Sequence, residues 1–100
     1  MNPATEEVLC EVSEGDAQDI DRAVQSARGC FESDGWRKLA PRQRGRMLAK
    51  AADILESRLD EFSKLETQHN GKPLFESKID VSMAIETLRY YGGWADKIVG

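Results

Sequence analysis

One histidine and two cysteines are the side chains best suited to chemistry in this sequence of 100 residues. A nucleophilic cysteine needs a nearby base, so any such pair would have to use His69. Cys10 and Cys30 lack the local sequences typical of an activated thiol, and their spacing is not that of a metal site. We therefore expect both cysteines to be reduced and packed as small apolar residues. We expect His69 to lie at a helix C-terminus, where a basic group favours the helix dipole.

Carboxylate pairs and one glycine–lysine step are the remaining candidates for chemistry. Asp19 and Asp21 belong to a stretch of helical periodicity whose polar residues face solvent, which does not favour a general acid or base. The Gly71-Lys72 step is not a phosphate-binding loop, because Glu66 stands where that motif requires glycine. The motifs therefore predict no catalytic residue, no cofactor-binding residue and no metal ligand in this chain.

The composition predicts one folded, soluble domain. Hydrophobic residues make up 40% of the chain and charged residues 32%, and no apolar stretch approaches the roughly 20 residues that cross a bilayer. The N-terminus has neither a basic nor an apolar targeting segment. These features predict a cytoplasmic protein with no membrane partner.

Charge is distributed unevenly along the chain. The net charge is −4, yet residues 37–50 contain basic side chains and no acidic one: Arg37, Lys38, Arg42, Arg44, Arg46 and Lys50. The acidic total, and the absence of aromatic residues among these basic ones, argue against a nucleic-acid partner. We expect the basic block to pair with acidic groups of a larger assembly.

The chain is organised around residues 41–67, which are predicted to form one long amphipathic helix. Their apolar residues recur at steps of three and four. Pro41 suits the first helical position, and the Asn70-Gly71 turn supplies a left-handed cap beyond the end.

A helix on each side of this long one completes the prediction. Asp16 is a suitable N-cap for a helix that ends near residue 33, ahead of an Asp34-Gly35 turn. A third helical region follows the Asn70-Gly71 turn and runs to about residue 97. Gly92-Gly93 weakens that helix, unless a closely packed partner requires small residues there.

Three features indicate that the chain is incomplete. Residues 7–12 alternate as in a short β-strand, but no second strand is predicted to pair with it. The apolar stripe of the third helix is wider than one helix face, and the chain ends on the apolar Ile98-Val99-Gly100 without a cap. Each feature needs a partner surface, so we expect the isolated chain to expose apolar surface and to associate or unfold non-cooperatively.

Short motifs occur in a fixed order along the chain: Asn2-Pro3-Ala4-Thr5-Glu6-Glu7-Val8, Trp36-Arg37, Leu65-Glu66-Thr67, Gly71-Lys72-Pro73 and Leu88-Arg89-Tyr90-Tyr91-Gly92-Gly93-Trp94-Ala95-Asp96-Lys97. Together they resemble the N-terminal part of the aldehyde dehydrogenase superfamily over all 100 residues. The last motif is similar to the branch that acts on retinal, acetaldehyde and betaine aldehyde.

The resemblance implies NAD(P)-dependent oxidation of an aldehyde to a carboxylic acid. NAD or NADP would be bound by the full-length enzyme and not by this segment, and the full-length enzyme would be a homo-oligomer. In the family a cysteine thiolate attacks the aldehyde and a glutamate activates water. Both groups are expected beyond Gly100, because Cys10 and Cys30 match neither the catalytic cysteine nor its motif.

The resemblance also implies a place for one group of side chains. The helix after Gly71-Lys72-Pro73 is similar to the one that borders the family's substrate tunnel. Ile79, Asp80 and Met83 are therefore expected at the tunnel entrance, with core packing as the alternative for Ile79 and Met83.

We therefore interpret the chain as mostly α-helical: three helices and a short N-terminal β-strand arm, forming part of an α/β aldehyde dehydrogenase fold. Residues 1–100 are expected to be a single incomplete domain, the N-terminal helical part of the NAD-binding domain, and to be catalytically silent alone. Two alternatives stay open. One is a standalone, non-enzymatic helical interaction module, and the other is an autonomous enzyme that uses Cys10 or Cys30 with His69.

Overall fold

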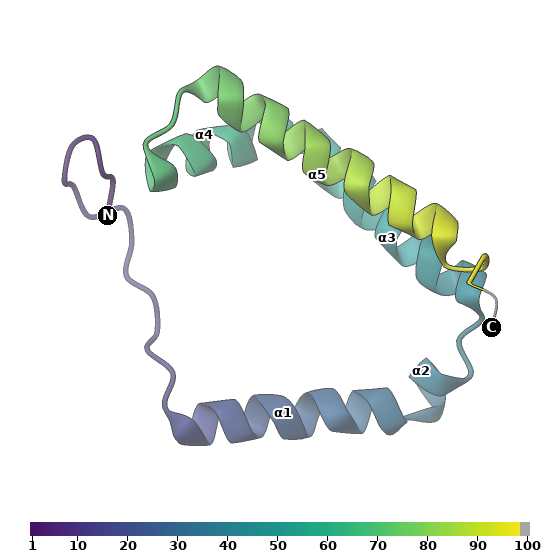
Figure 1. Cartoon of the computed structure of the whole chain (residues 1–100). Coiled ribbons are helices and arrows are strands. Elements are labelled where there is room, and N and C mark those ends of the chain that lie inside the picture. The colour runs from purple at the N-terminus through teal and green to yellow at the C-terminus, as the bar shows by residue number, and fades with distance from the viewer. Residues whose placement is uncertain (99–100) are drawn as a thin grey trace. The chain divides into compact units, whose positions relative to one another are not determined.

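The computed structural model describes residues 1–98 (Figure 1). The chain divides into two compact units. Unit 1 comprises Met1–Cys10 and the segment from Pro41 onward, and unit 2 comprises Glu11–Ala40. Unit 1 contains three of the helices and unit 2 contains two. None of the helices in the described part of the chain is both long and apolar enough to cross a membrane.

Unit 2 begins with helix α1, Ala17–Glu32, which is fixed by a strong local signal. The Asp16 carboxylate accepts a hydrogen bond from the Asp19 amide at 2.9 Å, and the Asp19 carboxylate accepts one from the Asp16 amide at 3.0 Å. This reciprocal capping box satisfies two amides that would otherwise have no partner. The predicted helix start at Asp16 is confirmed.

The end of α1 differs from the prediction. Where a turn was expected, Asp34–Arg37 form the short helix α2. The Ser33 hydroxyl donates to the Cys30 carbonyl at 2.7 Å and accepts from the Trp36 amide at 3.3 Å. One serine therefore ends α1 and begins α2, and the chain can wind another helical turn in place of an open loop.

The apolar stripe of α1 is exposed within unit 2. No residue of α1 is buried, and Ile20, Val24 and Phe31 expose 62%, 60% and 59% of their surface. Cys10 and Cys30 are also exposed, so the expectation that both pack as buried apolar residues is wrong. The reason is lack of cover: α2 has four residues, and Cys10 lies in an irregular segment.

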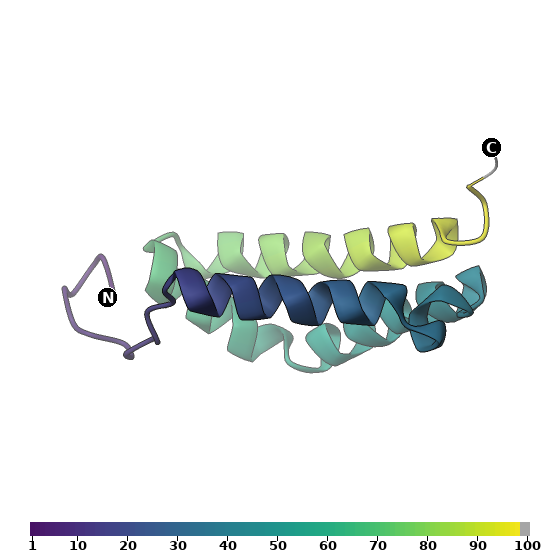
Figure 2. The same cartoon turned by 90° about the horizontal axis from the view of Figure 1, so that it is seen from below.

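Unit 1 contains two helices where one was predicted over residues 41–67. Helix α3 spans Pro41–Ser57 and helix α4 spans Leu59–Asn70, with a break at Arg58 (φ −117°, ψ 20°). The Arg58 amide donates to the Leu55 carbonyl at 3.1 Å, which tightens the last turn of α3. The break reorients the chain so that both helices pack against α5, Leu74–Trp94 (Figure 2).

The turn between α4 and α5 has the predicted cap. Gly71 adopts φ +82°, and its amide donates to the Thr67 carbonyl at 2.8 Å. Helix α5 then runs back along α4 and α3 and ends at Trp94, slightly before the predicted end (Figure 1). The predicted third helix is confirmed.

The core of unit 1 lies where α5 meets α3 and α4. Ala52, Val81 and Ile85 are buried, and partly buried apolar side chains surround them: Leu55, Leu59, Phe62 and Leu88. The fully buried Ser63 donates to the Leu59 carbonyl at 2.7 Å, and the fully buried Ser77 shares a 2.8 Å hydrogen bond with Thr67. Small hydroxyl residues therefore let α4 and α5 approach without leaving a buried polar atom unpaired.

Helices α3 and α5 touch through their backbones at two glycines. A Cβ atom placed on Gly45 would lie 2.4 Å from the Gly92 carbonyl oxygen, and one on Gly92 would lie 3.0 Å from the Gly45 carbonyl oxygen. Close packing therefore explains Gly92, as predicted. It does not explain Gly93, because a Cβ there would meet no atom within 4 Å.

The predicted N-terminal strand is absent: residues 1–98 contain no strand, and residues 7–12 are irregular. A strand needs a neighbour whose amides and carbonyls complete its ladder, and none is available in the described chain. Asn2 and Glu7 instead close a small loop, with the Asn2 amide donating to the Glu7 carbonyl at 2.8 Å. Of the apolar end expected at Ile98-Val99-Gly100, only Ile98 lies within the described residues, and it is exposed.

Candidate functional site

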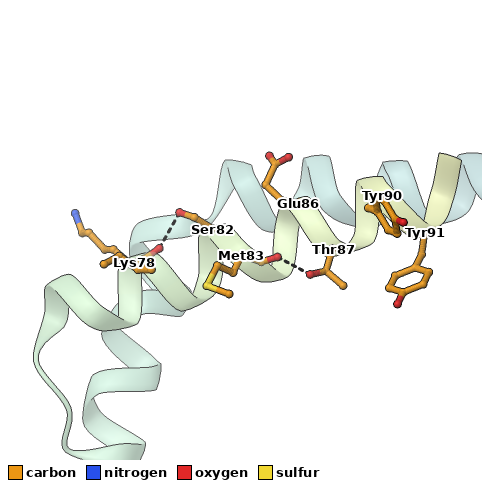
Figure 3. A pocket seen from close by; sticks show the side chains of 8 residues that line it. Lys78, Ser82, Met83, Glu86, Thr87, Tyr90 and Tyr91 are labelled. Carbon is orange, nitrogen blue, oxygen red and sulfur yellow. Dashed lines mark hydrogen bonds between the residues drawn. The ribbon is translucent and has the colours of Figure 1, made fainter. Parts of the chain in front are cut away.

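An open hollow of about 760 Å³ lies on the face of α5 that is turned away from its core (Figure 3). All of its lining residues belong to α5: Lys78, Ile79, Ser82, Met83, Glu86, Thr87, Tyr90 and Tyr91. Because one helix provides the whole lining, a bound molecule would have a floor but no opposite wall. This arrangement is that of the rim of a site, which a second surface would have to complete.

Helical periodicity explains why α5 has a second apolar face, opposite the face that it buries. Ser77, Val81 and Ile85 recur at steps of four and are the buried residues of α5. Ile79 and Met83 recur at the same step on the opposite side, where they expose 53% and 62% of their surface. A helix that is apolar on two faces can cover one core and still present apolar surface on its other side.

Several of the polar groups that line the hollow already have partners. The Ser82 hydroxyl donates to the Lys78 carbonyl at 2.7 Å, and the Thr87 hydroxyl donates to the Met83 carbonyl at 2.8 Å (Figure 3). The Lys78 ammonium lies 2.8 Å from the Asp60 carboxylate of α4. Surface offered to a ligand is therefore mainly apolar.

Aromatic rings extend this surface toward the C-terminal end of α5. Tyr90 and Tyr91 meet edge to face with their centroids 5.2 Å apart, and the Trp94 ring lies 6.0 Å from that of Tyr90. Edge-to-face contacts orient the rings without burying them. All three side chains are exposed.

The structure separates the three predicted entrance residues. Ile79 and Met83 line the hollow, whereas Asp80 does not, because the Lys72 ammonium hydrogen-bonds to its carboxylate. Lys72 also lies 2.6 Å from the Glu66 carboxylate. The hydrogen bonds from Lys72 to Asp80 and to Glu66 raise the pKa of Lys72.

This Lys72 bridge was not predicted from the sequence. Glu66 lies in α4, Lys72 in the turn and Asp80 in α5. Glu66 precedes Lys72 by six residues and Asp80 follows it by eight, which are not the spacings of a pair on one helix. Only a tight turn of known direction brings the three together, so periodicity could not have found the bridge.

A second group of ion pairs joins α5 to α3. Arg89 lies 2.5 Å from Glu56 and 3.2 Å from Asp53, and it also contacts Glu86 of its own helix at 3.3 Å. Its hydrogen bond to Glu56 lowers the pKa of that carboxyl and raises the pKa of Arg89. These groups are largely exposed, so we interpret the cluster as a set of structural ion pairs that join α5 to α3.

Part of the basic block finds acidic partners inside the chain. Arg42 lies 2.9 Å from Asp96 and its hydrogen bond lowers the pKa of that carboxyl, while Lys38 lies 2.6 Å from Asp34. For these two residues, the expectation that partners come from a larger assembly is wrong. Helix α3 brings Arg42 to Asp96, just beyond the end of α5, and the sequence separation of these residues conceals the contact.

The candidate residues for metal chemistry are not grouped into a site in the described part of the chain. His69 lies exposed in the last turn of α4, as predicted, but its helix end is capped by the Gly71 amide. Within residues 1–98, no three His, Cys, Asp or Glu side chains are grouped so as to hold a metal ion.

Several groups of the glycine turn of unit 1 that could bind a phosphate are bonded within the chain. Phosphates bind at free backbone amides of a helix start or at an unpaired cation. Here the Glu76 and Ser77 amides at the start of α5 donate to the Pro73 carbonyl, and both Glu66 and Asp80 hold Lys72. These two amides and Lys72 therefore already have partners within the chain.

Comparison with known proteins gives one consistent result. The aldehyde dehydrogenase family pattern matches residues 1–100. The chain is 46% identical over 102 residues to mitochondrial aldehyde dehydrogenase of Sus scrofa, and 45% identical over 100 residues to phenylacetaldehyde dehydrogenase of Pseudomonas fluorescens. Each match covers 99–100% of this chain and 20% of the relative.

Solved structures agree with the sequence relatives. The NAD+ complex of aldehyde dehydrogenase from Bacillus cereus is 43% identical, with a TM-score of 0.95, and the match covers 99% of this chain and 20% of that one. The chain thus spans about one fifth of the length of the relatives that it matches. With a family match over its whole length and this likeness in fold, the chain belongs to the aldehyde dehydrogenase family.

Proposed function

We propose that this chain is the N-terminal helical part of the NAD-binding domain of an enzyme that oxidises an aldehyde to a carboxylic acid with NAD or NADP. The observation that supports this most directly is the family match over residues 1–100, together with a fold that is similar to that of an NAD+ complex. We expect no dinucleotide to bind to this segment alone. The cofactor would therefore be held by parts of the enzyme outside this segment.

The segment's contribution would be the entrance for the substrate. Ile79 and Met83 would form an apolar floor on α5, and Asp80 would stand at its edge. All of the lining of the hollow comes from one helix, which is what a part of a shared entrance would look like before the rest of the enzyme covers it. An aldehyde with an apolar side chain would contact this surface through hydrophobic interactions on its way into the enzyme.

By itself the segment would be catalytically silent. Cys30 has no histidine in its own unit, because it belongs to unit 2 and the chain's one histidine belongs to unit 1. In the full-length enzyme we expect a homo-oligomer in the cytoplasm. The exposed apolar faces of α1 and α5 are surfaces that either the same subunit or another one would cover.

One observation favours a second function. The stripe of α1 leaves Ile20, Val24 and Phe31 exposed, as in a helix that binds another protein. A standalone helical interaction module would use that face and would have no enzymatic role.

A chimera tests the proposed enzyme. Residues 1–100 would replace the matching fifth of the Bacillus cereus aldehyde dehydrogenase, and reduction of NAD by aldehyde would be measured for the chimera and for the chain alone. We expect turnover from the chimera and none from the chain. A folded chimera that binds NAD but does not turn over, or turnover by the chain alone, would contradict the proposal.

Substitutions in the chimera test the entrance. Met83→Trp should raise the KM for a bulky aldehyde several-fold and leave kcat with acetaldehyde nearly unchanged, because it narrows an approach path without touching the reacting atoms. Phe75→Trp is the matched control, since Phe75 is also exposed on α5 (64%) but does not line the hollow. Equal effects of the two substitutions would remove Met83 from the entrance.

A further inference from the structure

The Lys72 bridge sits at the corner where α4 turns into α5. Its ammonium is held between the Glu66 carboxylate on one side and the Asp80 carboxylate on the other. The Lys72 side chain is only 19% exposed, the most covered charged side chain among these ion pairs, whereas that of Asp80 is 52% exposed. Because the Lys72 side chain is largely covered, its position is fixed. The Asp80 carboxylate that it binds is therefore fixed as well.

Asp80 belongs by helical geometry to the edge of the hollow. Residues three and four apart on a helix are surface neighbours, so Asp80 stands beside Met83, three residues further along. It also directly follows Ile79. Both of these neighbours line the hollow and Asp80 does not. The difference is the direction of its carboxylate, which bonds to Lys72 at the corner.

Without Lys72, the hollow would carry an anionic edge. The other ionic groups of the lining already have partners: Lys78 pairs with Asp60, and Glu86 shares Arg89 with two carboxylates of α3. A released Asp80 carboxylate would add an acidic group that has no other ion pair among the described residues. It would attract cations and disfavour anions within several ångströms.

We propose that Lys72 is a positioning residue that sets the charge preference of the α5 hollow: by holding Asp80 it keeps that carboxylate away from the entrance, so that uncharged aldehydes are admitted in preference to cationic ones. The inference rests on the proposed role of this hollow as a substrate entrance. It concerns a charge that the bridge removes from the hollow, and a binding measurement tests it without any catalytic step.

The test uses the 100-residue chain and two probes that differ in charge alone. Choline is the cationic probe, and neohexyl alcohol, its uncharged carbon isostere, is the neutral one. Binding is followed by NMR of isotope-labelled methionine methyl groups: Met83 reports on the hollow, and Met47 of α3, which is also exposed, is the internal reference. In the native chain we expect the Met83 signal to respond to the alcohol more strongly than to choline.

Releasing Asp80 should reverse that preference. Lys72→Met should increase the affinity for choline roughly two- to fivefold, the range expected for an exposed charge pair, and leave the alcohol unchanged. Adding Asp80→Asn to Lys72→Met should abolish the gain, and Lys72→Arg should keep the native preference. Lys97→Met is the matched control, because it removes a lysine–aspartate pair at the far end of α5.

Three results would overturn the proposal. They are a folded Lys72→Met chain with unchanged choline affinity, a gain that survives Asp80→Asn, and a native chain that already prefers choline. The last result needs no variant and therefore decides the question even if Lys72→Met fails to fold. An inactive chimera combined with the expected probe preferences would count against the proposed enzyme and leave the charge effect standing.

Discussion

Helices α1 and α5 carry apolar stripes of the same helical spacing and have opposite outcomes. In unit 1, α5 buries Val81 and Ile85 against α3 and α4, so that 9% and 2% of these residues remain exposed. In unit 2, the corresponding stripe of α1 is not covered, and Ile20 and Val24 each keep more than half of their surface exposed. A stripe therefore predicts that a helix can be covered, and the neighbouring elements decide whether it is.

The two units also differ in what holds their helices. Helix α1 depends on its capping box and on pairs between near neighbours, such as Arg22 with Asp19. Helix α5 has no side-chain cap at its start and depends on contacts with α3 and α4. Local bonds specify where a helix begins, but burial supplies most of the stability of a helix in a protein.

The largest expected effect comes from the core of unit 1. Ile85→Ala should lower the free energy of unfolding by about 2–5 kcal/mol, because it removes a buried side chain and leaves a cavity. Ile20→Ala, the same change at an exposed position of α1, should stay within about 0.5 kcal/mol. Urea unfolding measures both, with Trp94 reporting on unit 1 and Trp36 on unit 2.

That pair of variants could break the comparison. If Ile20→Ala were as costly as Ile85→Ala, the stripe of α1 would be covered in solution, and the two units would not differ in burial.

Glycine substitutions give the next effect. Gly45→Ala improves helix propensity by about 1 kcal/mol but places a methyl group against the Gly92 carbonyl, and overpacking typically costs about 1–3 kcal/mol. The obstructing atom is backbone, so we expect net destabilisation and a lower Tm. Gly29→Ala in α1 meets no atom within 4 Å and should raise helicity. A higher Tm for Gly45→Ala would show that α3 and α5 are not in backbone contact.

Acid should have a smaller effect that acts on different groups in the two units. In unit 1, hydrogen bonds from Arg89 lower the pKa of Glu56 below its ordinary 4.5. In unit 2, the Asp16 amide and Arg22 lower the pKa of Asp19 below its ordinary 3.8. Folded carboxyls with lowered pKa values bind fewer protons than unfolded ones, so each contribution is complete above the ordinary value and is lost as the pH falls through the lowered one.

Circular dichroism and the two tryptophans resolve this acid effect. Glu56→Gln should flatten the dependence of the unit 1 unfolding midpoint on pH below about 4.5, and Asp19→Asn should flatten the loss of α1 helicity below about 3.8. Added salt should weaken the unit 1 effect, since its ion pairs are exposed. A unit 1 midpoint that does not change between neutral pH and pH 3 would show that the Arg89 cluster contributes nothing to folding.

Periodicity and capping predicted most of the helices and little of what lies between them. The starts at Asp16 and Pro41 and the cap at Gly71 follow from residue chemistry that acts within one turn. The break at Arg58 could not be predicted, because no glycine or proline marks it, and the two helices that it joins both pack against α5. The predicted strand over residues 7–12 is wrong because alternating residues form a strand only where a partner strand is present.

In the candidate site, too, some residues could be placed from the sequence and others could not. Ile79 and Met83 could be placed on one helix face from their spacing of four, and the structure brings both to the hollow. The direction of the Asp80 side chain could not be predicted in this way, because it depends on Lys72, which is eight residues away and beyond a turn. Gly45 was also missed, although a glycine inside an amphipathic helix is a signal of close packing.

The sequence by itself determined the helical character of the chain, the positions of its caps and its membership of the aldehyde dehydrogenase family, because these depend on residue types and spacing over short distances. Only the tertiary structure decided which apolar stripe is buried, where the long helix breaks and which carboxylate Lys72 holds. Those outcomes depend on contacts between residues far apart in the chain, whose energies exist only after the helices have packed.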